Sequence, residues 1–283
     1  MIDLKPIAEK IKEADAILIG ASNGLSITEG LHLFADNTAF EEMFGDFKQK
    51  YGLQCILQGM MARWPSEEEK WAFWARLIHR YCIQYQPTPV MENLKAIVGE
   101  KDYFIVTSNG ECHFELCGFD QWKIYEIEGS WLTMQCARPC HGLRYSSLEL
   151  AEKLAAEEKC GRVPTELVPR CPKCGGSMDI HMGAGERMIP DTSAKKRFKT
   201  FLDAYHGKKL VVLELGIGWR NQLIKAPLMR LVAGETFAAY VTINLGEVYI
   251  ADDIREKSFG LDGSLDEMLL ALRESVEGGQ STF

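Results

Sequence analysis

The sequence predicts an α/β protein in which a mostly parallel sheet is covered by helices on both faces. Short apolar runs bounded by glycine or polar residues recur along the chain, and amphipathic helical patterns separate them. Parallel neighbouring strands need a long crossover, usually a helix, so this alternation favours a parallel sheet. With 283 residues, of which 46% are hydrophobic, the chain is long enough for one large domain or two modest ones.

Buried strands are predicted where short apolar runs end at glycine or polar residues. The predicted strands are residues 16–20, 103–109, 123–129, 210–216, 238–245 and 247–251. The segment from about 30 to 95 is rich in helical patterns and aromatic residues and contains no clear strand. The segment from about 130 to 200 carries two pairs of cysteines. We interpret both segments as insertions into a nucleotide-binding core.

Amphipathic helices are predicted over residues 3–14, 66–85, 146–159 and 264–275. A serine followed three residues later by a glutamate forms a capping box, which marks the start of a helix. This pattern opens the last three helices, at Ser66 and Glu69, Ser146 and Glu149, and Ser264 and Glu267. The aromatic residues Trp71, Trp74 and Tyr81 of the second helix are expected in the core rather than in a cofactor site.

The net charge of −8 disfavours nonspecific binding to nucleic acid or to anionic membranes. No run of about 18 apolar residues is present, so no membrane span is predicted. The first twenty residues lack the basic start and cleavage site of a secretory leader. We therefore expect a cytoplasmic protein without a nucleic-acid or membrane partner.

Two cysteine pairs, Cys136 with Cys140 and Cys171 with Cys174, stand out among nine cysteines. Disulfides are rare in the cytosol, and the odd total argues against a complete disulfide framework. Both pairs lie beside prolines and glycines, and two such pairs can surround one tetrahedral zinc ion. With four protein ligands and no open position, this zinc would be structural. The alternatives are a knuckle without metal, or a redox pair, which usually opens a helix after a strand.

Polar and glycine-rich stretches follow the ends of four predicted strands. The first strand runs into "IGASNGLSITEG" (19–30), and the second ends in "TSNGECHF" (107–114). Apolar runs also close on residues 216–218 and 243–244. Ligands of open parallel sheets bind outside the carboxyl ends of the strands, so these stretches predict a dinucleotide site. For any one stretch alone, a tight turn or a helix cap is the alternative.

In this order, the motifs resemble the sirtuin family over nearly the whole chain: "GASNGLSITEG", "VTSNGECHFELCGF", "EIEGSW", two cysteine pairs, "LELGIG" and "TINLGE". The resemblance implies a Rossmann-like domain that binds NAD⁺, with an inserted zinc ribbon and helical module. It divides the chain into a core of residues 1–30, 96–130 and 205–283, a helical insertion of 31–95, and a zinc-ribbon module with a substrate loop in 131–204. The zinc ligands it implies are Cys136, Cys140, Cys171 and Cys174.

The resemblance also assigns residues to the NAD⁺ site. The residues assigned to cofactor binding are Ala21, Ser22, Gly24, Leu25, Ser26, Gly30, Phe34, Asn37, Thr107, Ser108, Glu111, Gly216, Ile217, Gly218, Ile243 and Asn244. Asp36 is a further candidate near the nicotinamide end. Residues 256–263 are expected to border the adenine. His113 follows the second strand and is expected to be a packed or surface residue.

Three departures from the deacylase sirtuins bear on the reaction. Ala35 replaces the arginine of the family's motif after the glycine loop, Glu128 occupies the place of the base histidine, and "HMGAGERMIPD" (181–191) does not match the acyl-lysine-binding stretch. A glutamate, with an ordinary pKa near 4.3, is a weaker base than a histidine unless burial raises its pKa. These departures favour transfer of ADP-ribose over deacylation.

The chain is most similar to the macrodomain-linked, or class M, sirtuins, which the resemblance identifies as protein mono-ADP-ribosyltransferases. It implies cleavage of NAD⁺ to nicotinamide and transfer of ADP-ribose to an acceptor protein. The acceptor would be a lipoylated carrier like the glycine-cleavage H protein, and a macrodomain hydrolase would remove the mark. Two alternatives stay open: an NAD⁺-dependent protein deacylase with a substituted base, and an NAD⁺ sensor without catalysis.

Asn109 and Glu128 are the predicted catalytic residues. The amide of Asn109 would orient the nicotinamide ribose or a water near the anomeric carbon. The carboxylate of Glu128 would activate the acceptor or stabilise positive charge on the ribose. The alternatives are a cap or turn residue for Asn109 and a solvated surface carboxylate for Glu128.

Overall fold

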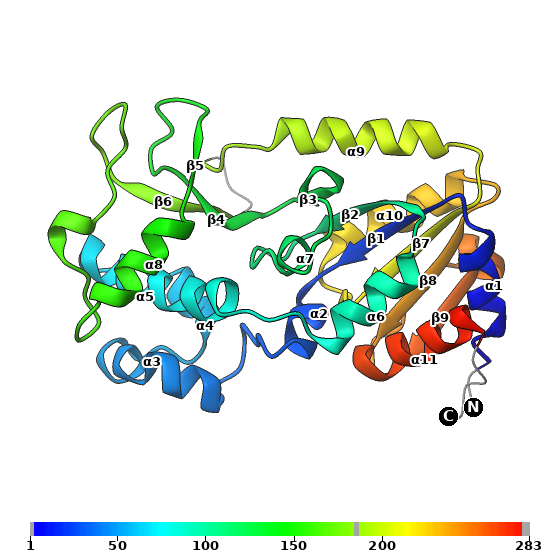
Figure 1. Cartoon of the computed structure of the whole chain (residues 1–283), viewed down its shortest axis with the longest axis horizontal. Helices are drawn as coiled ribbons and strands as arrows, with labels where there is room; N and C mark the ends of the chain where they lie inside the picture. Colours follow the sequence, from blue (N-terminus) through cyan, green and yellow to red (C-terminus); the bar gives the residue numbers. More distant parts are fainter. Residues whose placement is uncertain (1–2, 184–186, 279–283) are drawn as a thin grey trace.

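A six-stranded parallel sheet forms the larger of two parts of the molecule (Figure 1). The computed structural model describes residues 3–183 and 187–278. The strands of this sheet are β1 (Ala16–Ala21), β2 (Asp102–Thr107), β3 (Ile124–Glu126), β7 (Leu210–Leu215), β8 (Ala239–Asn244) and β9 (Ser258–Asp262). They lie in the order β3-β2-β1-β7-β8-β9, and every neighbouring pair is parallel. The predicted α/β fold with a Rossmann-like sheet is therefore confirmed.

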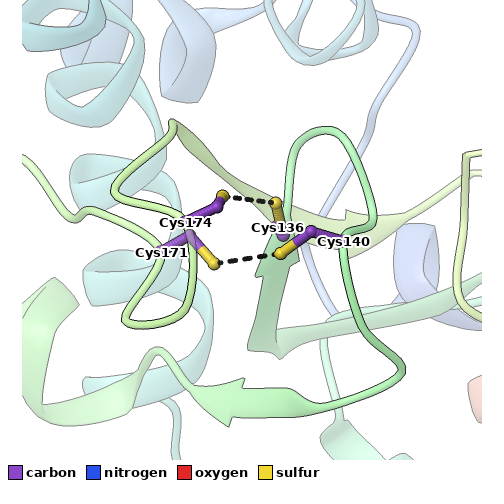
Figure 2. Close-up of side chains that lie close together, drawn as sticks. All are labelled: Cys136, Cys140, Cys171 and Cys174. Carbon is purple, nitrogen blue, oxygen red and sulfur yellow. Dashed lines mark hydrogen bonds between the residues drawn. The ribbon is translucent and has the colours of Figure 1, made fainter.

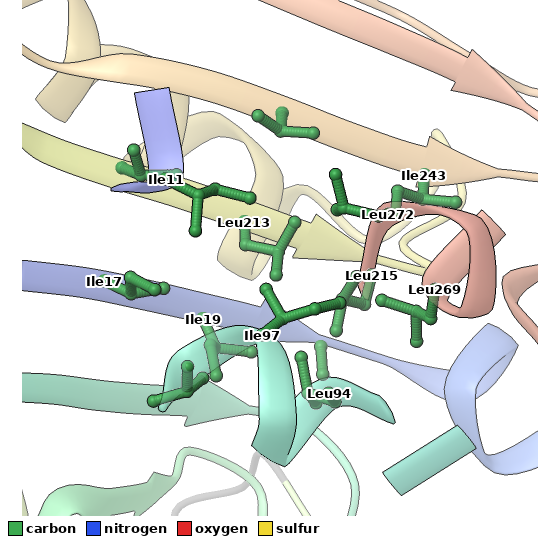
Figure 3. Packing of buried hydrophobic residues seen from close by; sticks show 14 of the residues in the cluster. Ile11, Ile17, Ile19, Leu94, Ile97, Leu213, Leu215, Ile243, Leu269 and Leu272 are labelled. Carbon is green, nitrogen blue, oxygen red and sulfur yellow. The ribbon is translucent and has the colours of Figure 1, made fainter. Parts of the chain in front are cut away.

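Alternate residues of the central strand β1 contribute to two different apolar clusters. Ile17 and Ile19 belong to one cluster, and Ala16 and Leu18 belong to the other. Because successive side chains of a strand point to opposite faces, a strand covered on both sides needs apolar residues at every position. This is the reason why the strand appears in the sequence as an unbroken apolar run. Figure 3 shows part of the first cluster, in which Ile19 of β1 lies near Ile97.

Helices cover both faces of this sheet. On the first face lie α1 (Lys5–Glu13), α6 (Pro89–Val98) and α11 (Leu265–Glu277). On the second face lie α9 (Thr192–Tyr205) and α10 (Gln222–Gly234). Helix α9 and the start of α6 fall in segments predicted as insertions, but both helices pack against the large sheet, so the division of the chain into units stays a prediction. Within the described residues, no helix has the length and apolar character needed to cross a membrane.

The second part of the molecule combines helices with a small antiparallel sheet. Its helices are α3 (Thr38–Tyr51), α4 (Ile56–Met60), α5 (Glu67–Ile78) and α8 (Leu148–Glu157). Its strands are β4 (Gly129–Cys136), β5 (Arg144–Ser146) and β6 (Met178–Met182), in the order β5-β4-β6. A shared apolar cluster joins these helices and strands, and Trp71, Trp74 and Tyr81 are buried in it. The prediction that these aromatic residues form core is confirmed.

One predicted strand is wrong. Residues 247–251 contain no strand, and the edge of the large sheet is instead β9, in the segment that was expected only to border the adenine. Hydrogen bonding to β8 selects β9, because Tyr240 to Asn244 pair with Ser258 to Asp262. The shorter elements are helices α2 (Asn23–Thr28) and α7 (His113–Leu116) and the 3₁₀ segments η2 (Gln121–Lys123), η3 (Thr165–Leu167) and η4 (Asp252–Lys257).

The three predicted capping boxes have different outcomes. Ser66 caps α5, since its hydroxyl accepts the backbone N–H of Glu69. Ser146 does not cap α8, because the helix begins one residue later with Ser147 at its N-cap. Ser264 holds the N-cap position of α11, but its hydroxyl donates to Asp266 instead of accepting a backbone N–H. The helix predicted to extend beyond residue 78 changes into a π-helical turn, η1 (His79–Ile83).

Candidate functional site

Two glycines, Gly24 and Gly216, are in close contact at the carboxyl edge of the large sheet. The strand order reverses between β1 and β7, and ligands of open α/β sheets bind beside such a point. Here the loop from β1 into α2 (Asn23–Thr28) crosses the end of β7. The backbone N–H of Gly24 donates to the carbonyl oxygen of Gly216 at 2.9 Å. Gly216 has a φ of +60°, a conformation that favours glycine.

The substitution Gly24→Ala tests this close approach. A Cβ at residue 24 would lie 2.5 Å from the Cα of Gly216, so the two loops must move apart. We expect at least a tenfold weaker affinity for NAD⁺, about 1.4 kcal/mol, with a smaller loss of thermal stability. Calorimetric titration and thermal unfolding measure the two effects. Gly234→Ala is the matched control, since no atom lies within 4 Å of its added Cβ. Unchanged affinity in Gly24→Ala would contradict this role of the contact.

Hydroxyl and amide groups from β1 and β2 meet beside this contact. The hydroxyl of Thr107 donates to the carbonyl of Ala21 at 3.1 Å, and it accepts the backbone N–H of Asn109 at 3.0 Å. The hydroxyls of Ser22 and Ser108 are 3.0 Å apart. The sequence predicted these residues for the NAD⁺ site. Thr107 contacts Ala21 and Ser108 contacts Ser22, although the members of each pair lie more than eighty positions apart along the chain.

The amide of Asn109 is buried with one atom unpaired. Its Nδ2 donates to the carbonyl oxygen of Ser22 at 3.2 Å, while its Oδ1 has no partner among the described residues. Only 6% of the Asn109 surface is exposed. A buried polar atom without a hydrogen bond is costly, so a bound ligand or water that donates to it would be stabilised.

Asn221 is a residue that the sequence interpretation missed. It stands at the N-cap of α10, and its Nδ2 donates to the hydroxyls of Ser22 at 2.9 Å and Ser108 at 3.0 Å. Its Oδ1 is also buried and unpaired among the described residues. The available signal was an asparagine directly before an amphipathic pattern, which is typical of a helix start.

Two glutamates, Glu29 and Glu111, link the glycine-rich stretch 19–30 to the residues that follow β2. Ser26 donates to the carboxylate of Glu111 at 2.5 Å. Glu29 contacts Nδ1 of His113 at 2.6 Å, and the ring of Tyr85 stacks on the imidazole. Burial alone would lower the pKa of His113. The hydrogen bond to Glu29, the negative charges of Glu111 and Glu29 and the carbonyl of Tyr81 together outweigh burial and raise the pKa. His113 is therefore a packed residue, as predicted.

The other predicted NAD⁺ residues fall into two groups. Leu25, Ile217 and Ile243 have buried side chains in the apolar clusters, so they offer a ligand only their backbone. The remainder lie in loops or at loop ends, where they have neighbours of their own. Phe34 is 51% exposed, and Asp36 pairs with Lys48. The side-chain oxygen of Asn37 accepts the backbone N–H of Phe40 and so caps α3, and the side chain of Asn244 donates to the carbonyl of Glu247. Gly30 is exposed and Gly218 is half-buried.

Two carboxyl groups, Glu126 and Glu128, lie where β3 passes into β4. Glu128 is half-buried, and burial raises the pKa of its carboxyl group. Glu126 is a second residue that the sequence interpretation missed. Burial raises its pKa to about 8, although the thiol of Cys112 and the hydroxyl of Ser130 act in the opposite direction. Glu126 also lines a cavity of about 690 Å³ between the small sheet and the start of α9.

The raised pKa of Glu126 predicts a pH dependence of stability. Its pKa of about 8 exceeds the value near 4.3 of an unfolded glutamate, so the folded state retains the proton between these values. This contribution is fully present below about pH 4.3 and is lost as pH rises through about 8. We expect urea unfolding to show that Glu126→Gln flattens the decline in stability over this window. The same pH dependence in both proteins would contradict the prediction, and Glu166→Gln, on the surface, is the matched control.

The four cysteines of the two pairs come together at the outer end of the small sheet (Figure 2). The sulfurs of Cys136 and Cys174 are 3.7 Å apart, as are those of Cys140 and Cys171, and all four lie within 4.8 Å of one another. A tetrahedral zinc with bonds of about 2.3 Å separates its sulfur ligands by about 3.8 Å. The donor set therefore fits a structural zinc ion.

Backbone amides favour the ionised form of one sulfur in this cluster, that of Cys171. Burial opposes ionisation of Cys171, but the N–H groups of Cys174 and Lys173, together with the thiols of Cys174 and Cys140, lower its pKa to about 6. Zinc binds the thiolate form of cysteine, so the lowered pKa makes Cys171 a better zinc ligand. Gly175, with a φ of +69°, closes the turn after Cys171 by donating to the carbonyl of Cys171.

Comparison with known proteins finds two curated relatives. A protein ADP-ribosyltransferase of Staphylococcus aureus is 31% identical over 267 residues, which cover 92% of this chain and 83% of that protein. A probable bifunctional ADP-ribose hydrolase/ADP-ribosyltransferase of Fusarium oxysporum f. sp. cubense is 27% identical over 221 residues, or 74% of this chain. The chain spans about a third of that longer protein, 36% of its length. No protein-family model matches the sequence.

Solved structures of sirtuins share the fold. A mutant Sir2 homologue in complex with 2′-O-acetyl ADP ribose has a TM-score of 0.67 at 15% identity, covering 98% of this chain and 97% of that one. A Sir2 enzyme solved for its mechanism and regulation has a TM-score of 0.59 at 15% identity, with 97% of both chains covered. A sirtuin solved to explain substrate affinity has a TM-score of 0.57 at 16% identity, covering 98% and 99%. At such identities the likeness concerns the fold.

Proposed function

Because this chain belongs to the sirtuin-like protein ADP-ribosyltransferases, which use NAD⁺, we propose that it transfers a single ADP-ribose to a lipoylated carrier protein. The observation that supports NAD⁺ as the donor in this proposal is the buried Oδ1 of Asn109 at the carboxyl edge of the sheet, which has no partner among the described residues. It offers a fixed acceptor where the nicotinamide end of the dinucleotide would lie.

In the proposed first step, the C–N bond between nicotinamide and the ribose breaks, and nicotinamide leaves with the bonding electrons. Positive charge develops at the anomeric carbon. Asn109 is held rigidly by Ser22 and Thr107, so its amide orients the ribose without a cost of reorganisation at that moment. The glycine contact of Gly24 with Gly216 lets the backbone approach the pyrophosphate.

In the second step, a nucleophile of the acceptor forms a bond to the anomeric carbon and loses a proton. We assign that proton to the carboxylate of Glu128. Burial raises the pKa of Glu128, which makes this carboxylate a stronger base than an exposed glutamate. The products are nicotinamide, the ADP-ribosylated acceptor and a protonated glutamate, which returns its proton to water.

The identity of the acceptor rests on the resemblance to macrodomain-linked sirtuins. That resemblance also proposes a macrodomain hydrolase as the partner that removes the mark. The name of the Fusarium relative joins both activities in one protein, which supports the pairing. We further propose a cytoplasmic location, because a reducing compartment keeps the cysteine thiols available for zinc.

The test is incubation of the purified protein with adenylate-labelled NAD⁺ and a glycine-cleavage-H-like carrier, with and without lipoyl groups. Label on the lipoylated carrier alone is expected. Label on neither form would contradict the proposed acceptor, and acyl removal without label would favour a deacylase. Nicotinamide release by the unmodified protein separates an enzyme from a sensor.

The base is tested by the matched variants Glu128→Gln and Glu126→Gln. We expect Glu128→Gln to lower the transfer rate at least a hundredfold, as is typical for loss of a general base, and to leave NAD⁺ affinity close to wild type. Glu126→Gln is expected to retain transfer. The reverse pattern would assign the base to Glu126 and contradict this mechanism.

A further inference from the structure

We propose that Asn221 is a binding residue for a ribose diol of the dinucleotide, acting together with Asn109. This inference rests on the proposed function, because it concerns the same NAD⁺ crevice. It adds a residue outside the motifs of the resemblance, contributed by the first turn of α10 rather than by the glycine loop or the end of β2.

The side-chain amides of Asn109 and Asn221 both donate hydrogen bonds to Ser22. Asn109 donates to the carbonyl oxygen of Ser22, and Asn221 donates to the hydroxyl of Ser22. A carbonyl oxygen only accepts, so the orientation of the Asn109 amide is determined by its partner. The amide oxygens of both side chains are then buried and have no partner within residues 3–183 and 187–278.

The orientation of Asn221 follows from counting protons. Its Nδ2 carries two protons, which match the hydroxyl oxygens of Ser22 and Ser108, and one hydroxyl proton completes the 3.0 Å contact between these serines. In the reverse orientation both hydroxyls would donate to the amide oxygen. No proton would remain for the contact between the serines. The observed arrangement therefore leaves Oδ1 as the free acceptor.

The unpaired amide oxygens of Asn109 and Asn221 favour a ligand that donates hydrogen bonds. A phosphate at neutral pH offers oxygens and almost no donor, so it cannot satisfy them. A ribose diol presents two neighbouring hydroxyl protons and fits a pair of amide oxygens. The remaining hydroxyl proton of Ser22 and Ser108 can be donated to a ligand oxygen in turn. The cluster is thus complementary to a sugar rather than to the pyrophosphate.

A buried ion pair holds Asn221 in place. Lys225, one turn further along α10, contacts the carboxylate of Glu214 on β7 at 2.5 Å, and both side chains are at most 1% exposed. Tyr240 and Thr242 of β8 also donate to this carboxylate. The first turn of α10 is therefore attached to β7 through Glu214, whose carboxylate is held in turn by β8, and Lys225 acts as a positioning residue.

The test is calorimetric titration with ADP-ribose and with ADP, using wild-type protein and Asn221→Ala. Loss of one hydrogen bond from a buried site is expected to weaken ADP-ribose binding roughly tenfold or more. If ADP binding weakens by the same factor, the diol belongs to the adenosine ribose. If ADP binding is unchanged, it belongs to the other ribose. Gln222→Ala removes an exposed neighbouring amide and is the matched control.

Unchanged ADP-ribose affinity in a folded Asn221→Ala protein would overturn the inference and leave the proposed function intact. Weaker NAD⁺ binding with unchanged ADP-ribose binding would also overturn it, because the contact would then be to the carboxamide. Failure of the wild-type protein to bind ADP-ribose or NAD⁺ would overturn the proposed function itself. If Asn221→Ala does not fold, Asn221→Ser, which keeps a hydroxyl for Ser22 and Ser108 but lacks the amide oxygen, provides the same measurement.

Discussion

Replacing Lys225 with methionine is expected to destabilise the folded protein by about 3–5 kcal/mol, the typical cost of leaving a buried charge without its partner. The ammonium of Lys225 is the cation in contact with Glu214, and neither side chain reaches solvent. Tyr240 and Thr242 remain as donors, but they do not supply a positive charge. Urea unfolding followed by circular dichroism measures the change.

The control for this prediction removes both charges. The double variant with Lys225→Met and Glu214→Gln leaves a neutral amide among the same hydroxyls, and we expect it to recover most of the lost stability. Lys199→Met, at an exposed pair with Asp203, is expected to change stability by less than about 1 kcal/mol. A Lys225→Met protein as stable as wild type would contradict this prediction.

Substituting Cys171 with serine is expected to abolish zinc binding and to unfold the outer end of the small sheet. Wild-type protein is expected to contain one zinc ion per chain by elemental analysis. Cys171 is buried and supplies one of four sulfurs within 4.8 Å of one another, so a hydroxyl there leaves three ligands and a weaker site. Structural zinc contributes directly to folding free energy, about 10 kcal/mol or more in small zinc domains.

Hydrogen exchange locates this effect. Amides of β4 and β6 are expected to lose protection in Cys171→Ser, while those of β1 and β7 keep it, because the large sheet has its own apolar clusters. Cys160→Ser, an exposed cysteine outside the cluster, is the matched control and is expected to retain zinc. Equal zinc content in wild type and Cys171→Ser would contradict the four-sulfur site.

The parallel sheet was predictable because its strands are covered on both faces. Both β1 and β7 are buried along their whole length. The sequence of β1 is an uninterrupted apolar run, and that of β7 is apolar except for Glu214, so both strands can be recognised without knowledge of their neighbours. Segment 247–251 shows why the same signal fails at an edge. Its apolar residues Val248 and Ile250 lie over Gly260 of β9, where they pack against the strand without joining the sheet.

The candidate site divides in the same way. Glycine and polar residues after strand ends are a local feature, and the topology of a parallel sheet gathers them at one edge, so Ser22 and Ser108 could be predicted to lie together. Asn221 and Glu126 could not. Asn221 joins the site because the fold places the start of α10 against Ser22. The pKa of Glu126 is raised because the folded chain buries its carboxyl group.

The sequence by itself determined the class of fold, the order of the motifs around the crevice and the four sulfur ligands, because each depends on residue type and local spacing. Only the tertiary structure decided which strand forms the edge, which amide oxygens are left unpaired and which carboxyl group retains a proton. These properties depend on burial and on partners distant in the chain. Desolvation and hydrogen bonding act through space, and neither is encoded in a short stretch of sequence.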